Sequence, residues 1–211
     1  ALGALVQAFD ESGNSVIDEL GELVITKPMP SMPIYFWNDP EGKRYFESYF
    51  DMYPGVWRHG DWIKIRHDGT CQIYGRSDST INRGGIRIGT SEIYRAVESV
   101  PGVNDSLVID ISDEKGNAYM PLFVVLKEGV DLTEELKEQI KKQIRTYCSP
   151  RHVPNDIFEI DEVPRTLNGK KLEVPIKKIL LGVPPEKAVN LGSMSNPQSL
   201  EFFIKMSKNS R

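Results

Sequence analysis

The pattern of apolar and polar positions changes from alternation in the first third of the chain to helical spacing after residue 90. Apolar and polar residues alternate in LVQAF (5–9) and in GELVITK (21–27), on either side of the turn-forming sequence ESGN. Successive side chains of a strand point to opposite faces, so this alternation predicts two strands joined as a hairpin. A second hairpin is predicted for WIKIRH and TCQIYG, because they flank the favoured turn pair Asp68-Gly69.

Residues 28–58, between the two predicted hairpins, show no regular period and are rich in proline and aromatic residues. The pattern predicts a long loop with its aromatic side chains packed beneath it, because aromatic rings gain much free energy from burial. An exposed interaction surface is the alternative.

After residue 90 the spacing predicts helices alternating with strands. TSEIYRAVESV (90–100) offers Thr90 or Ser91 as the N-cap of a helix that Pro101-Gly102 ends. Further elements are predicted from the same patterns: strands over 104–111, 119–127 and 156–161, and helices over 131–148 and 172–181. This order of helix, strand, strand, helix, strand and helix predicts a compact α+β domain.

The composition changes at Gly75–Asp78, which predicts a domain boundary. The fold class is therefore α+β, with a β-rich domain over residues 1–77 and a compact α+β domain over residues 78–181. Residues 182–211 form a polar C-terminal extension with one weak helical pattern at 199–206. The extension cannot build a core alone, so we expect it to pack on the rest or to fray.

Composition excludes several classes of function. The net charge of -4 gives no general attraction to nucleic acid. No apolar run approaches the ~20 residues that span a bilayer, and the first residues lack a signal-peptide pattern.

Cys71 and Cys148 are too few for a disulfide framework, so we expect a cytoplasmic protein with reduced thiols. His59, His67 and His152 show no metal-ligand spacing, so no metal site is expected in this chain.

The run from Gly75 to Gly89, GRSDSTINRGGIRIG, is the first candidate for chemistry. Its arginines can bind phosphate, and its glycines allow the backbone to rearrange. An Arg/Gly-rich surface loop is the alternative.

Two further motifs contain one charged residue beside a glycine. In WRHGDW (57–62), Asp61 follows a glycine at the entry to a strand, where a carboxylate can accept two hydrogen bonds from a ribose diol. A turn-capping aspartate is the alternative. In PRTLNGKKLEVP (164–175), a tight Asn-Gly turn presents Lys170, for which a solvated surface lysine is the alternative.

Taken together and in this order, the motifs resemble the C-terminal part of the adenylate-forming superfamily, which comprises acyl-CoA synthetases, peptide-synthetase adenylation domains and luciferases. The matching positions are Gly60-Asp61, Gly75-Arg76-Ser77-Asp78, Gly84-Gly85-Ile86-Arg87 and Gly169-Lys170. The segments KPMPSMPIYFWNDPEG and EKAVNLGSMSNPQSL further resemble the acetoacetyl-CoA synthetase family. The resemblance covers essentially the whole chain.

The resemblance implies an AMP-forming ligase that activates a carboxylic acid in two steps. ATP and the acid give an acyl-adenylate and pyrophosphate, and CoA then gives the thioester and AMP. Acetoacetate is the implied acid, with acetate or another short-chain acid as the alternative. A non-catalytic module that binds AMP or CoA is a second hypothesis, and a peptidyl-carrier adenylation domain is a third.

The same resemblance implies roles at the nucleotide. Asp61 binds the ribose hydroxyls, Arg76 assists there, and Arg87 approaches the phosphate or gates the pantetheine channel. Lys170 reaches the carboxylate and the α-phosphate, where an ammonium stabilises the charge that adenylation builds. Asp78 is the hinge about which the small domain swings between the two half-reactions.

Roles at CoA follow from the resemblance as well. Gly84 and Gly85 line the pantetheine channel, where a Cβ would obstruct the thiol. Lys141, or Arg145 in its place, contacts the phosphates of CoA. Arg83 is assigned no role.

The superfamily's Ser/Thr/Gly-rich phosphate loop and its acyl-binding segments do not occur in these 211 residues. The chain also starts without Met, inside a predicted strand. We therefore expect the last third or so of a longer enzyme, inactive by itself. An N-terminal domain would supply the remaining ATP contacts and most of the Mg²⁺ site.

Overall fold

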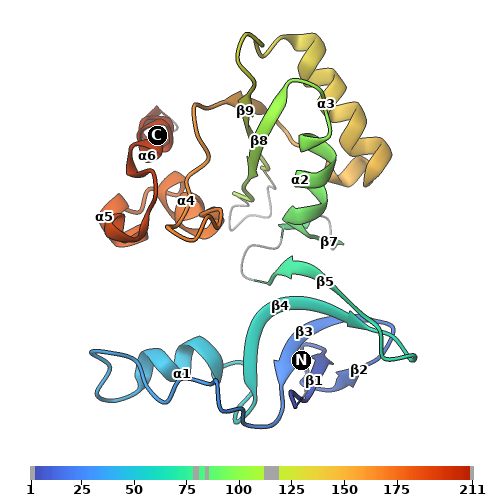
Figure 1. Cartoon of the computed structure of the whole chain (residues 1–211), viewed down its shortest axis with the longest axis vertical. Helices are drawn as coiled ribbons and strands as arrows, with labels where there is room; N and C mark the ends of the chain where they lie inside the picture. Colours follow the sequence, from blue (N-terminus) through green and yellow to red (C-terminus); the bar gives the residue numbers. More distant parts are fainter. Residues whose placement is uncertain (1–2, 78–80, 84–85, 112–118, 210–211) are drawn as a thin grey trace. The chain divides into compact units, whose positions relative to one another are not determined.

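The chain divides into two compact units, a first unit of Ala1–Asp78 and a second unit of Ser79–Arg211 (Figure 1). The computed structural model describes residues 3–77, 81–83, 86–111 and 119–209. Each unit has its own buried apolar core. The units are therefore described separately.

The described residues of the first unit form an antiparallel sheet of five strands in the order β2-β1-β3-β4-β5. The strands are β1 (Val6–Phe9), β2 (Ser15–Val16), β3 (Leu20–Ile25), β4 (Trp57–Ile65) and β5 (Cys71–Arg76). The predicted pairing of 5–9 with 21–27 is confirmed as β1 against β3. The prediction that the ESGN turn joins these two strands directly is wrong. The turn joins β1 to β2, which pairs with the other edge of β1.

Side-chain hydrogen bonds close two of the turns in this sheet. Asp10 accepts the amides of Ser12 and Asn14 at 2.9 and 2.8 Å, which closes the turn between β1 and β2. Asp68 accepts the amide of Thr70 at 2.9 Å, and Gly69 adopts φ +80° in the turn between β4 and β5. The second predicted hairpin is thus confirmed.

The aromatic segment is less irregular than predicted, because it contains the helix α1 (Lys43–Tyr49). Asp39 orders its first turn by accepting the amides of residues 44 and 45. Tyr49 stacks on Trp57 with ring centroids 3.7 Å apart, which confirms packing for this part of the segment. For Tyr35 and Trp37 the packing prediction is wrong, since they are 68% and 82% exposed.

The second unit has the predicted order of elements after the short hairpin of β6 (Ile81–Arg83) and β7 (Ile86–Ile88), which was not predicted. The predicted elements are α2 (Thr90–Glu98), β8 (Val103–Val108), β9 (Leu122–Leu126), α3 (Glu134–Tyr147), β10 (Ile157–Glu159) and α4 (Glu173–Leu180). The short 3₁₀ helix η1 (Pro150–His152) follows α3. The sheet order is β10-β9-β8, with β9 parallel to β10 and antiparallel to β8. The predicted N-cap of α2, Thr90 or Ser91, is wrong: Gly89 is the N-cap, and Thr90 is already helical and buried.

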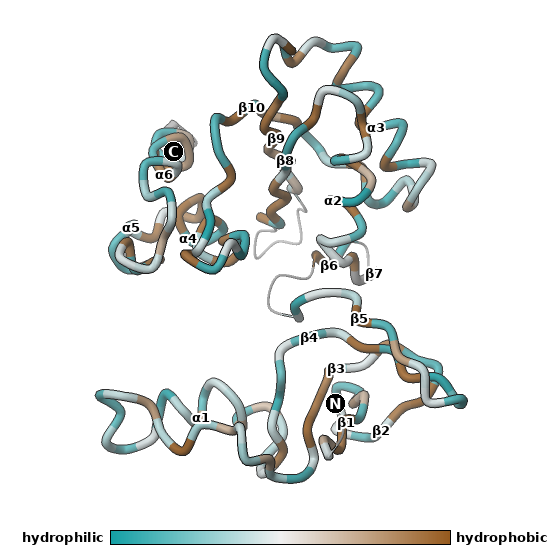
Figure 2. The backbone as a smooth tube through the Cα atoms, viewed as in Figure 1, coloured by the Kyte–Doolittle hydropathy of each residue, from teal (hydrophilic) through white to brown (hydrophobic). Residues whose placement is uncertain are grey.

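The sheet of the second unit is covered on both faces. Val108 and Val124 point to one face and join the buried residues of α2 and α3. Leu107 and Phe123 point to the other and join those of α4 and the C-terminal tail. Figure 2 shows the hydrophobic residues of β9 between these layers. The period of two in each strand therefore provides two cores, one on each face.

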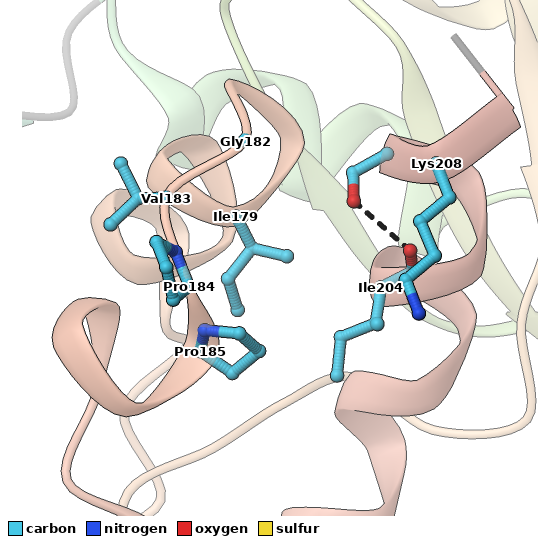
Figure 3. Close-up of a pocket in the computed structure, with 8 residues that line it drawn as sticks. Ile179, Gly182, Val183, Pro184, Pro185, Ile204 and Lys208 are labelled. Carbon is cyan, nitrogen blue, oxygen red and sulfur yellow. Dashed lines mark hydrogen bonds between the residues drawn. The ribbon is translucent and has the colours of Figure 1, made fainter. Parts of the chain in front are cut away.

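The tail after α4 forms α5 (Pro185–Ala188), η2 (Leu191–Ser193), η3 (Pro197–Ser199) and α6 (Leu200–Asn209). It packs on the second unit, because Phe203 is fully buried with its ring centroid 4.9 Å from that of Phe123. A shallow cavity of about 160 Å³ lies between α6 and the end of α4, lined by Ile179 and Ile204 among others (Figure 3). Of the two outcomes expected for the tail, packing is the one observed.

Replacing Phe203 should therefore destabilise the second unit. We expect Phe203→Ala to lower its free energy of unfolding by about 3–5 kcal/mol, the cost of emptying a large aromatic site in a core. During urea unfolding, far-UV circular dichroism reports mainly the second unit, because it contains all the described α-helices except α1. Tryptophan fluorescence reports the first unit, where all three tryptophans lie. Phe202→Ala, at a side chain 36% exposed, is the control and should cost about 1 kcal/mol. Equal losses in both variants would contradict the packing of the tail.

Candidate functional site

Asp61 and Arg76 occupy paired positions on the neighbouring antiparallel strands β4 and β5. The structure thus brings together two residues that lie fifteen positions apart in the sequence. The Asp61 side chain is 16% exposed, and Arg76 is exposed. A carboxylate and a guanidinium on one edge of a sheet offer hydrogen-bond acceptors and donors to a polar ligand.

Gly60 gives β4 the bend that places this pair. Its φ of +86° is favourable only for glycine, and a Cβ there would lie 2.8 Å from Nη2 of Arg76. The pairing of β4 shifts in register with both of its neighbours. The shift against β3 falls between Glu22 and Val24 of β3, and the shift against β5 falls between Trp62 and Ile63 of β4. The glycine before Asp61 is therefore required both by the backbone and by the space that Arg76 fills.

Glu22 holds the bend from the neighbouring strand β3. Its carboxylate is 2% exposed, and Oε1 accepts the Gly60 amide at 3.0 Å and the Ser77 hydroxyl at 3.0 Å. The Ser77 amide in turn donates to the Gly60 carbonyl at 3.0 Å. Burial raises the pKa of Glu22, against the opposing effects of the Ser77 hydroxyl and Arg58. One buried carboxylate thus joins the bend to the end of the first unit.

His59 is the other partner of the pair. Its Nδ1 makes a short contact with Oδ2 of Asp61, and its carbonyl accepts Nη1 of Arg76 at 3.4 Å. Sequence reasoning missed both His59 and Glu22. The available signals were an acid inside the apolar strand GELVI and a histidine two positions before Asp61, on the same side of a strand.

In the second unit, Lys170 lies exposed at the end of a tight turn. The Thr166 amide donates to the Lys170 carbonyl at 2.9 Å, and the Lys170 amide donates to the Thr166 hydroxyl at 3.1 Å. Gly169 has φ +77° and donates its amide to the Thr166 carbonyl at 2.8 Å. The closed backbone leaves the Lys170 ammonium outside, as the sequence predicts.

The neighbouring lysine has a different environment. Nζ of Lys171 lies 2.7 Å from Glu98 and 2.9 Å from Asp105, and it donates to the Ser106 carbonyl at 2.7 Å. It also lies 3.8 Å from the ring centroid of Tyr94, so a cation–π contact accompanies the ion pairs. Because the Lys171 ammonium is paired with carboxylates on α2 and β8, Lys170 is the lysine of this motif that can approach a ligand.

Arg165 links the same network to the turn. Its Nη2 lies 2.6 Å from Asp105, and its Nη1 donates to the Gly169 carbonyl at 2.6 Å. Burial alone raises the pKa of Asp105, but hydrogen bonds from Arg165 and Lys171 outweigh it and lower the net pKa. The ionised carboxylate therefore stabilises the fold above pH ~4, and this contribution is lost as the pH falls through the lowered pKa.

Arg83 is the last residue of β6, which pairs with β7. Ile81 and Ile88 are buried in the core beneath it. Arg83 donates to the carbonyls of Arg151 and Val153, which ties the hairpin to the segment after α3. This contact gives Arg83 a structural role that sequence reasoning did not assign.

Several predicted site residues cannot be placed by their side chains. Asp78, Gly84 and Gly85 lie outside the described residues. For Arg87 only the backbone is described, and it pairs with Asn82 across the hairpin.

On α3, Nζ of Lys141 lies 3.0 Å from Glu138 of the same helix. Arg145, one turn further on, is exposed. The structure therefore places one predicted CoA contact in an intrahelical ion pair and the other toward solvent.

Two features are absent from the described residues. They contain no group of three or more His, Cys, Asp or Glu side chains that could hold a metal ion. None of their helices combines the length and apolar character needed to cross a membrane.

Part of the chain matches a known protein family. Residues 92–170, from α2 to Lys170, match the family model described as the AMP-binding enzyme C-terminal domain. This match covers less than half of the chain. The resemblance to adenylate-forming enzymes that the motifs indicated is thereby confirmed.

The similarity to individual proteins extends over nearly the whole chain. Acetoacetyl-CoA synthetases of Xenopus tropicalis and of Rhizobium meliloti are 42% and 43% identical over 96% of this chain. The solved structure of acetoacetyl-CoA synthetase from Streptomyces lividans is 50% identical over 100% of the chain, with a TM-score of 0.92. The chain corresponds to the C-terminal portion of these proteins and spans about 30% of the length of the curated relatives.

The different environments of the two lysines predict different effects on stability. Lys171→Met removes the ammonium but keeps the side-chain volume, and leaves Glu98 and Asp105 without it. We expect a loss of about 1–3 kcal/mol, below the value for a fully buried pair because Lys171 is 16% exposed. Lys170→Met should change stability by less than about 0.5 kcal/mol. Urea unfolding followed by circular dichroism measures both, and equal effects would contradict the assignment of Lys171 to the network.

Proposed function

We propose that this chain is the C-terminal part of an AMP-forming ligase that converts acetoacetate, ATP and CoA into acetoacetyl-CoA, AMP and pyrophosphate. The observation that carries the proposal is the match of 96% of the chain to acetoacetyl-CoA synthetases at 42–43% identity. In this proposal the first unit is the end of a large adenylating domain. The second is the mobile domain, with residues 182–211 as its extension.

The first unit would bind the nucleotide. Asp61 accepts hydrogen bonds from the ribose diol, and Arg76 on the paired strand adds donors at the same sugar. The short contact from His59 orients the Asp61 carboxylate, and the bend at Gly60 fixes its direction. Such prior orientation lowers the entropic cost of holding the ligand in one pose.

The second unit would supply the charge for adenylation. Attack of the acid carboxylate on the α-phosphorus brings two anions together, with pyrophosphate as the leaving group. The Lys170 ammonium stabilises the negative charge that develops there and aligns the carboxylate. The exposed position of Lys170 on a closed turn supports this role.

Thioester formation requires Lys170 to leave and a path for the CoA thiol to appear. We assign the swing to a hinge at Asp78, the channel to Gly84 and Gly85, and the approach to the phosphate or the gating of the channel to Arg87. Lys141 or Arg145 would contact the CoA phosphates. A glycine-lined path admits the pantetheine arm close to the backbone.

The remaining requirements lie beyond this chain. Magnesium accompanies ATP in such reactions, but the described residues hold no matching cluster of ligands, so no step is assigned to it. We propose that an N-terminal domain supplies the triphosphate and acyl contacts. We also propose a cytoplasmic location, consistent with two cysteines that form no disulfide.

The role of Lys170 predicts that the two half-reactions can be separated. In the full-length enzyme, Lys170→Ala should slow acetoacetate-dependent ATP–pyrophosphate exchange by ~10²–10³. It should leave the conversion of preformed acetoacetyl-adenylate and CoA into thioester unchanged. Lys178→Ala, at an exposed lysine of α4, is the matched control. An equal loss in both half-reactions would show that Lys170 does not act in adenylation.

The identity of the acid can be tested directly. Pyrophosphate release by the full-length enzyme should be fastest with acetoacetate among acetoacetate, acetate, propionate and butyrate at equal concentration. A higher kcat/KM for acetate would assign the chain to another short-chain acyl-CoA synthetase. No release with any acid, while AMP or CoA still binds, would favour a non-catalytic binding module.

A further inference from the structure

We propose that the tail segment Ser193–Asn196 is a positioning element for Lys170, which holds the lysine turn in the geometry that adenylation needs. This inference rests on the proposed function of Lys170. The segment lies beyond the matched family domain, which ends at Lys170 itself. The tail would thus contribute to the reaction without contacting a substrate.

The first support is backbone pairing between the tail and the turn. The Leu167 amide donates to the Ser193 carbonyl at 2.9 Å, and the Ser195 amide donates to the Arg165 carbonyl at 3.1 Å. Thr166 and Met194 form an antiparallel bridge between them. The tail therefore pairs through a single β-bridge with the chain that enters the turn.

The side chain of Asn196 reinforces this pairing. Its Oδ1 accepts the Arg165 amide at 3.0 Å, while its Nδ2 donates to Glu162 at 2.8 Å and to the Val163 carbonyl at 3.0 Å. Both ends of one amide group are thus bonded to three residues that precede the turn, Glu162, Val163 and Arg165. A hydrophobic side chain at this position could replace none of these bonds.

The tail is itself firmly anchored. Met194 is 5% exposed, Leu200 is 2% exposed and Phe203 is fully buried, all in the core beneath the sheet. On its other side the turn is held by Arg165, which bridges Asp105 and the Gly169 carbonyl. The lysine turn is consequently held between two fixed parts of the unit.

This clamp matters because the turn has little burial of its own. Residues 167–170 are all exposed, so hydrogen bonds rather than a core keep them in one conformation. Segments of this kind open at low free energy. Displacing a catalytic group by about 1 Å can cost ~10²-fold in rate, so a loosened turn slows adenylation even with Lys170 intact.

The experiment compares Asn196→Ala with Gln198→Ala. Gln198 is an exposed neighbour whose side-chain amide donates to the same Glu162 oxygen at 3.3 Å. The control therefore removes a tail contact to Glu162 and keeps the acceptor for the Arg165 amide. Asn196→Asp retains that acceptor too and serves if the alanine variant fails to fold by circular dichroism.

The first readout is amide hydrogen exchange on this chain. Asn196→Ala should speed exchange at Leu167 and Gly169 at least ~10-fold, while the amides of β9 stay protected as in the unchanged chain. Gln198→Ala should leave all of these amides unchanged. Asn196→Asp keeps the acceptor for the Arg165 amide but turns a carboxylate toward Glu162 in place of a donor, so it should also speed exchange at Leu167. Unchanged exchange at Leu167 in Asn196→Ala overturns the clamp.

The second readout is the pair of half-reactions in the full-length enzyme. Asn196→Ala should slow ATP–pyrophosphate exchange ~10-fold and leave thioester formation from preformed adenylate unchanged. Equal slowing of both half-reactions, or faster amide exchange with unchanged adenylation, overturns the positioning role. If Lys170→Ala retains adenylation, the proposed function fails, while the exchange measurement still decides whether the tail holds the turn.

Discussion

The ammonium of Lys171, held between the carboxylates of Glu98 and Asp105, is the contact on which the geometry around Lys170 depends. It joins the end of α2, the start of β8 and the chain that leaves the lysine turn. Isolated charges are costly to bury, but here each carboxylate has a cation or hydroxyl partner, and the ammonium also faces the ring of Tyr94. The network therefore orients two adjacent lysines oppositely, one inward and one toward solvent.

The first unit uses a buried carboxylate for a comparable purpose. The Glu22 carboxylate can be buried in the sheet because the Gly60 amide and the Ser77 hydroxyl donate hydrogen bonds to it. It fixes the bend before Asp61 and the residue next to the proposed hinge at Asp78. In both units an internal polar contact thus fixes the backbone next to a candidate site residue.

Much of the architecture could be predicted from local sequence. The α2 and α3 helices, the strands of the second unit and the hairpin at Asp68-Gly69 follow from periodicity and turn residues that act over a few positions. The helix α1 and the strand β2 could not, because backbone hydrogen bonds to the Asp39 carboxylate order the helix and pairing with β1 creates the strand. The exposure of Trp37 also followed from no local rule, since apolar character alone does not say what covers a side chain.

For the candidate site, the sequence by itself determined the residue types and their order: a Gly-Asp pair, an Arg/Gly-rich run and a Gly-Lys turn. Those motifs were sufficient to indicate the family, because glycine conformations and charged groups are local properties. Only the tertiary structure decided that the Lys171 ammonium is paired with carboxylates while Lys170 is exposed. It also decided that Arg83 bonds to the segment after α3 and that Asn196 bonds to the chain that precedes the lysine turn. These outcomes depend on partners tens of residues away, which chain folding alone brings within hydrogen-bond distance.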